Sequence, residues 1–482
     1  MCTGGIFYNH GSRYVGSLCF YAQARGMEAK EMVMIDRVLL EELEPRVLLS
    51  GDLGTISTSL LTPTENPVVV YDLPELAAEP TEGTTGQAIS AGPLSVPTDA
   101  PALQSTYEGM VQSEANPAFC DPALDFDYLV ITNEFLRDAS SMDYTMDDFV
   151  ARKEANGYAT TVVTVEDIYA NYTGVDNQEA IRNFIRDAYE SWGIEYVLLG
   201  GNADVIPVRQ VVNDAAGNPY IATDMYYQCL DGSWDGNGNG VWGERTDGES
   251  GGEIDWYSEV YIGRALLSTE AELANWVYKT LDYEDKADAA YRHNALMVGE
   301  YTGFGGTYAN WGKYCMDKLV TGSTKGGFTT AGFDSDASFD VDTLYARDAE
   351  WGPADILTKI NTDDYGIYNH LGHGNGGIVM GASDVQFEAS MTNENPFFMY
   401  SQACWSGYYL TPDSVAESLL SHTRTGAAAL VLNSNYGWGV WEDGTDGSSQ
   451  RLNREFWDAA FNEGIYTLGA MNADSHEDLV WN

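Results

Sequence analysis

The stretch from Tyr365 to Gly377 reads YGIYNHLGHGNGG, and the stretch from Phe397 to Gly407 reads FFMYSQACWSG. Each begins with a short apolar run that is typical of a buried strand. His373 follows the first run between glycines, and Cys404 follows the second run. Sites in open α/β sheets form beyond the carboxyl ends of strands. If the two strands are neighbours, these side chains are therefore expected to meet.

A cysteine beside a histidine is the arrangement that a thiol nucleophile needs. An imidazole near the sulfur favours the thiolate and can protonate a departing amine. Glycines let a substrate backbone approach closely, and the main-chain N–H groups of Gly374 and Cys404 are candidates for an oxyanion hole. The alternative for each residue alone is structural: a small buried thiol, and a histidine in a loop.

From Asp127 onward the chain alternates apolar runs with helical periodicity. A capping box at Thr145 and Asp148 predicts a helix that Gly157 closes, and a second helix is predicted to end at Gly193. Another helix is expected over Ser268–Asp285 and one near Val415–His422. The expected strands are Tyr128–Thr132, Ala159–Val165, Tyr196–Gly200, Ala295–Gly299, Tyr365–Leu371, Phe397–Ser401 and Ala427–Leu432.

This alternation of strands and helices predicts an α/β fold with mostly parallel sheets covered by helices on both faces. We divide the chain into four parts. They are an export or surface segment at 1–52, a linker or pro-segment at 53–124, a first α/β subdomain at 125–285 and a catalytic α/β subdomain at 286–482.

The two segments that carry the chemistry resemble the catalytic segments of gingipain-type cysteine peptidases, which share a clan with caspases and legumain. The resemblance extends to Tyr128–Thr132, Gln178–Arg186, Tyr196–Gly201, Val260–Arg264 and Asp413–Glu417. It implies a caspase-like fold in which Cys404 is the nucleophile, His373 is the base and His370 is structural.

The resemblance also implies an acidic residue, shortly after an Ile-Pro step, that orients the histidine. Here Ile206-Pro207 is followed by Val208-Arg209, which supplies no carboxylate. A Cys–His dyad and an acid from elsewhere in the chain both stay open.

The same resemblance suggests a substrate pocket. Asp224 matches an aspartate that lines the specificity pocket of arginine- and lysine-cutting members, and a buried carboxylate there would select a cationic side chain. Trp438 would wall that pocket. The alternatives are that Asp224 caps a turn or supports the site, and that Trp438 is ordinary packing.

The stretch from Asp231 to Glu244 reads DGSWDGNGNGVWGE, with oxygen-bearing side chains at alternate positions and glycines between them. This resembles the first half of an EF-hand-like calcium loop, but Thr246 stands where the usual glutamate would lie. The candidate ligands are Asp231, Asp235, Asn237, Asn239 and Glu244, with Asp247, Glu253 or Asp255 as further sources of charge. We expect calcium as a structural ion and no cofactor for the chemistry. The alternative is a flexible turn without an ion.

The charge of the chain is strongly negative: 73 Asp and Glu against 24 Lys and Arg give a formal net charge of −49. Such a field repels phosphate backbones and anionic lipid, so nucleic acids and membrane surfaces are poor partners. Six cysteines without a C-x-x-C pair indicate neither a zinc knuckle nor a disulfide scaffold. No apolar stretch is long enough for a transmembrane helix.

The N-terminal region differs from the rest of the chain in amino-acid composition. Residues 1–35 lack the pattern of a cleavable signal peptide, whereas Leu43–Leu49 (LEPRVLL) resembles a segment found near the start of exported and surface proteins of bacteria. Residues 53–118 are rich in Pro, Thr, Ser and Glu and read as a linker. The sequence therefore predicts a secreted or surface cysteine endopeptidase acting on proteins or peptides, and the resemblance at Asp224 suggests cleavage after basic residues. The rival prediction is a catalytically silent surface-display module on the same fold.

Overall fold

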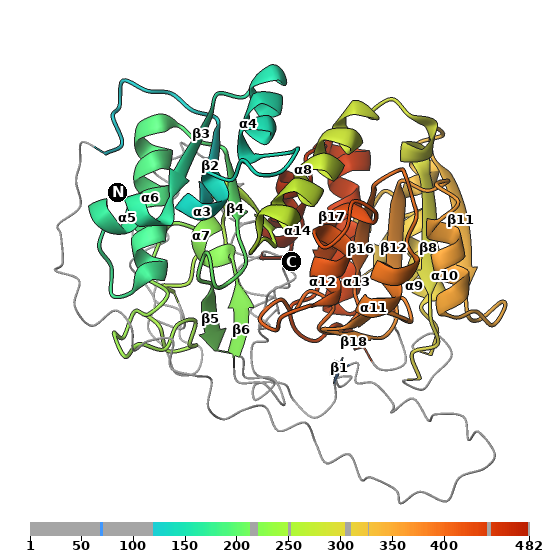
Figure 1. The fold of residues 1–482 in the computed structure, drawn as a ribbon. Helices are drawn as coiled ribbons and strands as arrows, with labels where there is room; N and C mark the ends of the chain where they lie inside the picture. Colours follow the sequence, from blue (N-terminus) through green and yellow to red (C-terminus); the bar gives the residue numbers. More distant parts are fainter. Residues whose placement is uncertain are drawn as a thin grey trace, which may run out of the picture. The chain divides into compact units, whose positions relative to one another are not determined.

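Alternating strands and helices build two parallel sheets in the computed structural model of the chain (Figure 1). The structure describes residues 119–212, 220–248, 252–303, 310–325, 327–440 and 445–480, together with the backbone of Val68–Val70. The predicted α/β class with parallel sheets flanked by helices is confirmed.

The first sheet has the strand order β3-β2-β4-β7, and all its neighbours run parallel. Its strands are Tyr128–Thr132 (β2), Thr160–Thr164 (β3), Tyr196–Gly200 (β4) and Tyr261–Ala265 (β7). Alternate residues of β2 point to opposite faces and both sets are buried. Leu129 and Ile131 join the core under α5 and α6, whereas Val130 packs with residues of α4 and α8. The helices of this half are Glu134–Arg137 (α3), Met146–Ala155 (α4), Val165–Asn171 (α5), Asn177–Trp192 (α6), Met225–Gln228 (α7) and Glu270–Asp285 (α8).

Helix α6 shows how the local sequence sets these elements. The Asp176 side chain accepts a hydrogen bond from the Glu179 amide and caps the first turn. Apolar residues at helical spacing, among them Ile181 and Phe184, face the core. Gly193 ends the helix in the left-handed conformation, with φ 74°, which a residue without Cβ adopts at little cost.

The second sheet carries five parallel strands in the order β11-β8-β12-β16-β17. They are Asn294–Gly299 (β8), Asp340–Tyr345 (β11), Ile367–Leu371 (β12), Phe397–Ser401 (β16) and Ala427–Leu432 (β17). One face packs on α10, α11 and α12, and the other packs on α9, α13 and α14. The helices here are Ala290–His293 (η4), Lys313–Thr321 (α9), Phe333–Ser335 (η5), Pro353–Ile360 (α10), Asp384–Ser390 (α11), Val415–Leu420 (α12), Ser448–Asp458 (α13), Ala459–Glu463 (η6) and Leu468–Val480 (α14).

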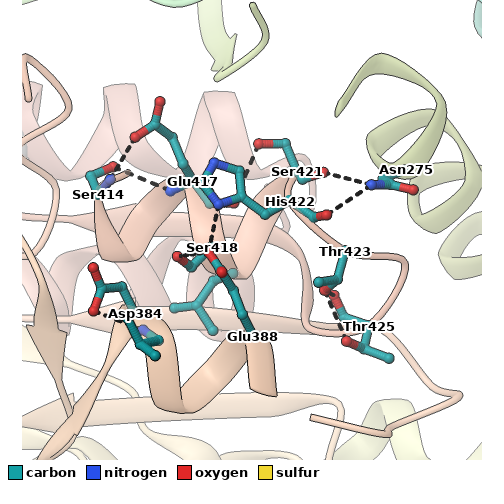
Figure 2. A network of polar contacts seen from close by, with 12 residues as sticks. Asn275, Asp384, Glu388, Ser414, Glu417, Ser418, Ser421, His422, Thr423 and Thr425 are labelled. Carbon is teal, nitrogen blue, oxygen red and sulfur yellow. Dashed lines mark hydrogen bonds and ion pairs between the residues drawn. The ribbon is translucent and has the colours of Figure 1, made fainter. Parts of the chain in front are cut away.

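A polar network joins α8 to the end of α12 (Figure 2). The Asn275 amide donates to the carbonyls of Ser421 and His422 at 3.1 and 3.0 Å. The ammonium of the buried Lys279 donates to the carbonyls of Leu419 and Thr425, both at 2.9 Å. The carbonyls at the C-terminal end of α12 are thus satisfied by side chains of α8.

Four small antiparallel ladders complete the described strands. They are β5–β6 (Arg209–Val212, Tyr220–Thr223), β9–β10 (Ser323–Lys325, Phe328–Thr330), β13–β14–β15 (Gly374–Asn375, Ile378–Val379, Ala382–Ser383) and β1–β18 (Val68–Val70, Trp438–Val440). In the last ladder Val70 pairs with Trp438 and Val68 with Val440.

The described side chains all fall within one unit, Val47–Trp481, so the predicted boundary between 285 and 286 stays a prediction. The predictions for 1–52, and nearly all of those for 53–124, concern residues outside the described part of the chain. No helix among the described residues is both long and apolar enough to cross a membrane.

Candidate active site

Strands β12 and β16 are direct neighbours, which brings the two predicted catalytic segments to the same edge of the second sheet. The parallel register pairs His370 with Ser401, and the Gln402 main-chain amide donates to the His370 carbonyl at 3.0 Å just beyond the ladder. A Cβ on Gly374 would lie 2.8 Å from the Ala403 Cβ and 3.1 Å from the Cys404 carbonyl oxygen. The segment that carries His373 therefore touches the segment that carries Cys404.

Cys404 lies in a tight turn after β16 and is 4% exposed. The Gly437 amide, after β17, donates to its sulfur at 3.3 Å. Trp405 holds φ 58°, an uncommon value for a residue with a side chain, and its amide donates to the Asn435 carbonyl at 2.7 Å. Contacts from the loop after β17 thus fix the position of the thiol.

The His373 imidazole is oriented by main-chain atoms that follow β8. Its Nε2 lies 3.1 Å from the Tyr301 carbonyl oxygen. A carbonyl can only accept, so Nε2 carries the proton in this hydrogen bond and Nδ1 is the basic nitrogen of the neutral ring. The Tyr301 side chain is 52% exposed next to this histidine, and its ring packs on Trp311 with centroids 4.8 Å apart.

Glu300 is a site residue that the sequence reasoning missed. One carboxylate oxygen accepts the His373 amide at 2.8 Å, and the other lies 3.1 Å from Nε2 of His370. The second ring nitrogen of His370 lies 2.8 Å from the Ser401 hydroxyl, so this fully buried ring ties β8 to β16. The segment after Ile206-Pro207 has another role, because Arg209 pairs with Asp176 at 2.7 Å.

Gly372 makes the approach of Glu300 possible. A Cβ at that position would lie 2.3 Å from Cδ of Glu300 and 2.4 Å from Nε2 of His370. Only glycine leaves room for both groups. Glu300 directly follows the predicted strand 295–299, but its approach to His373 depends on which strand is the neighbour of that strand in the sheet.

Asp224 forms a bidentate ion pair inside the chain. Its two oxygens accept from Nη2 and Nε of Arg264 at 2.7 and 2.8 Å, and the Tyr409 hydroxyl donates to it at 3.3 Å. The third guanidinium nitrogen donates to the carbonyls of Gly201 and Ile206. Burial opposes the charge of Arg264, but the Asp224 carboxylate outweighs it and raises the pKa of the guanidinium. A counter-ion within the fold thus already meets Asp224.

Trp438 is buried and packs in the core of the first half. Its amide donates to the Ser449 hydroxyl at 2.8 Å, which joins β18 to α13. Its ring lies against Tyr436, which in turn packs on Trp405. An aromatic row therefore runs from the core to the turn that follows Cys404.

In the acidic loop the expected ligand oxygens accept hydrogen bonds from the loop itself. Asp235 accepts the amides of Asn239 and Gly240 at 3.0 and 2.8 Å, and the Asn237 amide group donates to Glu244 and Asp247. The pKa of Asp247 is raised mainly by burial. The nearby negative charges of Glu244 and Asp235 raise it further. The main-chain amide of Asp231, the first of the expected ligands, donates to the Asp255 carboxylate at 3.1 Å. Among the described residues no three carboxylates of this loop come within 4.8 Å of one another.

Comparisons with known proteins find relatives in sequence and in fold. The sequence model of Peptidase family C25 matches residues 121–482. Gingipain R2 of Porphyromonas gingivalis is 25% identical over 323 residues, which are 63% of this chain and 37% of the relative. Gingipain R1 of the same organism is 25% identical over 323 residues, 63% of this chain and 28% of the relative. The chain thus spans well under half the length of these curated relatives.

Two solved structures share the fold. The Arg specific cysteine proteinase gingipain R superposes with a TM-score of 0.52 and 20% identity, over 73% of this chain and 72% of that one. The complex of the pro- and mature domains of RgpB from Porphyromonas gingivalis gives a TM-score of 0.52 and 21% identity, over 73% and 74%.

Proposed function

The chain belongs to peptidase family C25, and from that premise we propose that it is a cysteine endopeptidase with Cys404 as nucleophile and His373 as general base. The observation that carries the proposal is the contact of the two segments at one sheet edge, where Gly374 abuts Ala403 and Cys404. The rival function, a silent display module, rests on the LEPRVLL segment, the acidic charge and the missing carboxylate after Ile206-Pro207. Glu300, whose carboxylate accepts the His373 main-chain amide, speaks against the last of these three arguments.

The proposed mechanism is acyl transfer. Nδ1 of His373 takes the thiol proton, and the Cys404 thiolate attacks the peptide carbonyl carbon. The amides of Gly374 and Cys404 stabilise the oxyanion of the tetrahedral intermediate. The imidazolium then protonates the departing amine, and a thioester forms. Water, deprotonated by His373, hydrolyses the thioester and returns the thiol.

Glu300 and the Tyr301 carbonyl are the positioning groups of this mechanism. The carbonyl fixes the tautomer that leaves Nδ1 basic, and the carboxylate holds the His373 main chain. Two successive residues after β8 thus take the place of the acid that was expected after Ile206-Pro207.

Substrate binding as an extended strand is supported by β18. Its residues Trp438–Val440 pair antiparallel with Val68–Val70, and the amide just before β18 donates to the Cys404 sulfur. The edge of β18 accepts one extended segment next to the nucleophile, so it also suits the backbone of a peptide substrate. Main-chain hydrogen bonds of this kind form whatever the side chains of the peptide are.

The first test replaces the nucleophile. Cys404→Ala should abolish peptide hydrolysis and labelling by a thiol-directed peptide probe while the melting temperature stays unchanged. Cys120→Ser is the control, since this buried thiol contacts Tyr172 far from the sheet edge, and it should keep full activity. Hydrolysis by Cys404→Ala at the wild-type rate would overturn the proposal.

The finer part of the proposal is a preference for a basic residue before the scissile bond. The acidic chain favours cationic partners, and gingipain R is described as Arg specific. Because Asp224 already pairs with Arg264, Asp224→Asn separates two roles. If Asp224 binds the substrate cation, the variant loses preference for Arg and Lys peptides and keeps its stability. If Asp224 serves the fold, the variant melts several degrees lower and keeps its preference.

We also propose a structural calcium ion for the loop 231–247, and export to the cell surface or exterior. The carboxylates of Asp235, Glu244 and Asp247, which Asn237 and Asn239 hold along one loop, support the calcium ion. The LEPRVLL segment supports export. In wild type, calcium should protect this loop from proteolysis. In Asp235→Asn we expect this protection to be lost. Equal protection of the variant and the wild type would contradict the assignment. For export, an antibody against the intact chain should find it in the medium or on unpermeabilised cells.

A further inference from the structure

Two aromatic residues, Tyr301 and Trp311, lie beside the candidate general base, and we call them the aromatic pair. The main-chain carbonyl of Tyr301 lies 3.1 Å from Nε2 of His373. The Tyr301 side chain is 52% exposed, and its ring packs on the ring of Trp311 with centroids 4.8 Å apart in an edge-to-face arrangement. A large apolar surface is therefore open to solvent directly next to the imidazole.

Main-chain contacts hold the aromatic pair in place. Tyr301 and Trp311 face each other in an antiparallel bridge, and residues that are directly opposite in such a pair carry their side chains on the same face. The next amide, that of Thr302, donates to the Asn310 carbonyl at 2.8 Å. Thr302 is buried, so the chain alternates between an exposed Tyr301 and a buried Thr302, as in a strand. The two rings are thus positioned by the backbone before any substrate binds.

The strand order of the second sheet gives the direction in which a peptide crosses the site. In the order β8-β12-β16-β17, the base follows β12 and the nucleophile follows β16 (Figure 1). Tyr301 follows β8, beyond the base, whereas Gly437, whose amide contacts the Cys404 sulfur, follows β17 beyond the nucleophile. The base protonates the departing amine, so the part of the peptide that leaves lies on the β8 side. The part that forms the thioester lies on the side of β17 and β18.

We propose that the aromatic pair binds the side chain of the residue immediately after the scissile bond and selects an apolar or aromatic side chain there. This inference rests on the proposed peptidase function, because it names a specificity-determining residue for the same acyl transfer. The residue that carries the departing amine lies next to the imidazole and therefore next to Tyr301. Its apolar side chain leaves water when it packs on the exposed ring, and an aromatic side chain adds a further ring contact.

The charges around the aromatic pair disfavour an ionic side chain at this place. The guanidinium of Arg347 lies over the Trp311 ring, 5.7 Å from its centroid, and its positive charge opposes a second cation at these rings. The net charge of −49 on the whole chain opposes an anion. A neutral apolar side chain meets neither penalty. The preference after the scissile bond therefore differs in kind from the basic preference proposed for the residue before it.

The test uses peptides that share one sequence before the scissile bond and carry Phe, Ala, Lys or Glu directly after it. The full chain should cleave the Phe peptide with a kcat/KM about tenfold above that of the Ala peptide, and the Lys and Glu peptides no faster than the Ala peptide. Tyr301→Ala should bring the ratio of Phe to Ala close to one, whereas Tyr301→Phe should keep the wild-type ratio because the ring remains. Tyr466→Ala is the matched control, since this exposed tyrosine lies between η6 and α14, and it should leave both the ratio and the rates unchanged.

The ratio of two peptides is the readout, because a substitution that only disturbs the base slows both peptides equally and cancels. An unchanged ratio in Tyr301→Ala would overturn the inference, and so would a wild-type preference for the Lys or the Glu peptide. A methyl ester of the shared sequence separates these results from a failure of the peptidase proposal, since its leaving group is too small to reach the rings. If the wild type hydrolyses the ester but cleaves the Phe and Ala peptides equally well, only the inference fails. If it hydrolyses neither the ester nor any peptide, the peptidase proposal fails and the inference fails with it.

Discussion

Glu300 contacts two residues of the candidate site. One of its carboxylate oxygens accepts the His373 main-chain amide, and the other lies next to the His370 ring. Glu300→Gln keeps an acceptor for the amide and removes the charge. We expect kcat/KM to fall by about 10²-fold, the scale of a misplaced catalytic group. We expect the loss in kcat with KM little changed, because the imidazole rather than a substrate contact is displaced. Steady-state rates with a peptide substrate measure both constants.

Glu417→Gln is the control for this substitution. Glu417 is similarly buried, but it caps α12 and accepts from Asn202 at 2.6 Å, remote from the imidazole. It should lower the melting temperature and leave kcat unchanged. An unchanged kcat in Glu300→Gln would show that Glu300 acts only on the fold.

At the scale of single residues, a motif was enough to predict which two segments meet. The segments of His373 and Cys404 were expected to adjoin because each follows an apolar run, and they do adjoin. Glu300 could not be named, because its role depends on β8 lying beside β12, and no local pattern sets that order. The pairing of Asp224 with Arg264 was hidden for the same reason: the two residues meet only after the strands pair.

Elements were predictable where their apolar pattern is regular. Strands β2, β4, β16 and β17 have the bounds expected from sequence. Helix α13 was missed although it is central to the second sheet. Its buried residues include Gln450, Asn453 and Arg454, whose hydrogen bonds replace the apolar stripe that periodicity detects.

The contact between α8 and α12 makes a prediction about pH. Burial lowers the pKa of Lys279 from its ordinary 10.5 to about 7. Between these values the unfolded chain binds a proton that the folded chain lacks, so the free energy of unfolding rises with pH from about 7 to 10.5 and is flat below. Lys279→Met should remove a slope of up to about 1.4 kcal/mol per pH unit. Urea unfolding at pH 7, 8 and 9 measures the difference from wild type.

Lys286→Met provides the matched control, because Lys286 caps the same helix from a half-exposed position and pairs with Asp282. It should retain the wild-type dependence on pH. A parallel dependence of Lys279→Met and wild type would mean that Lys279 stays charged in the fold, stabilised by the two carbonyls it contacts.

The whole molecule carries a net charge of −49, which acts over distances that no single contact reaches. Such a field speeds the encounter with cationic substrates and slows that with anionic ones. Salt distinguishes attraction by this long-range field from binding in a pocket. The Debye length falls from about 30 Å at 0.01 M salt to about 10 Å at 0.1 M, so added salt weakens the long-range attraction. A buried ion pair between enzyme and substrate is screened much less.

The measurement compares two peptide substrates that have the same residue before the scissile bond. One peptide has Lys in its flanking positions, and the other has Ser. The ratio of their kcat/KM values should fall severalfold between 0.01 and 0.1 M NaCl, because the flanking charges feel only the long-range field. A second pair, with Arg or Ala before the scissile bond and neutral flanks, should keep most of its ratio if a pocket reads the cation. If both ratios collapse together with salt, the acidic surface alone accounts for a basic preference, and neither Asp224 nor any other pocket residue needs to bind the substrate cation.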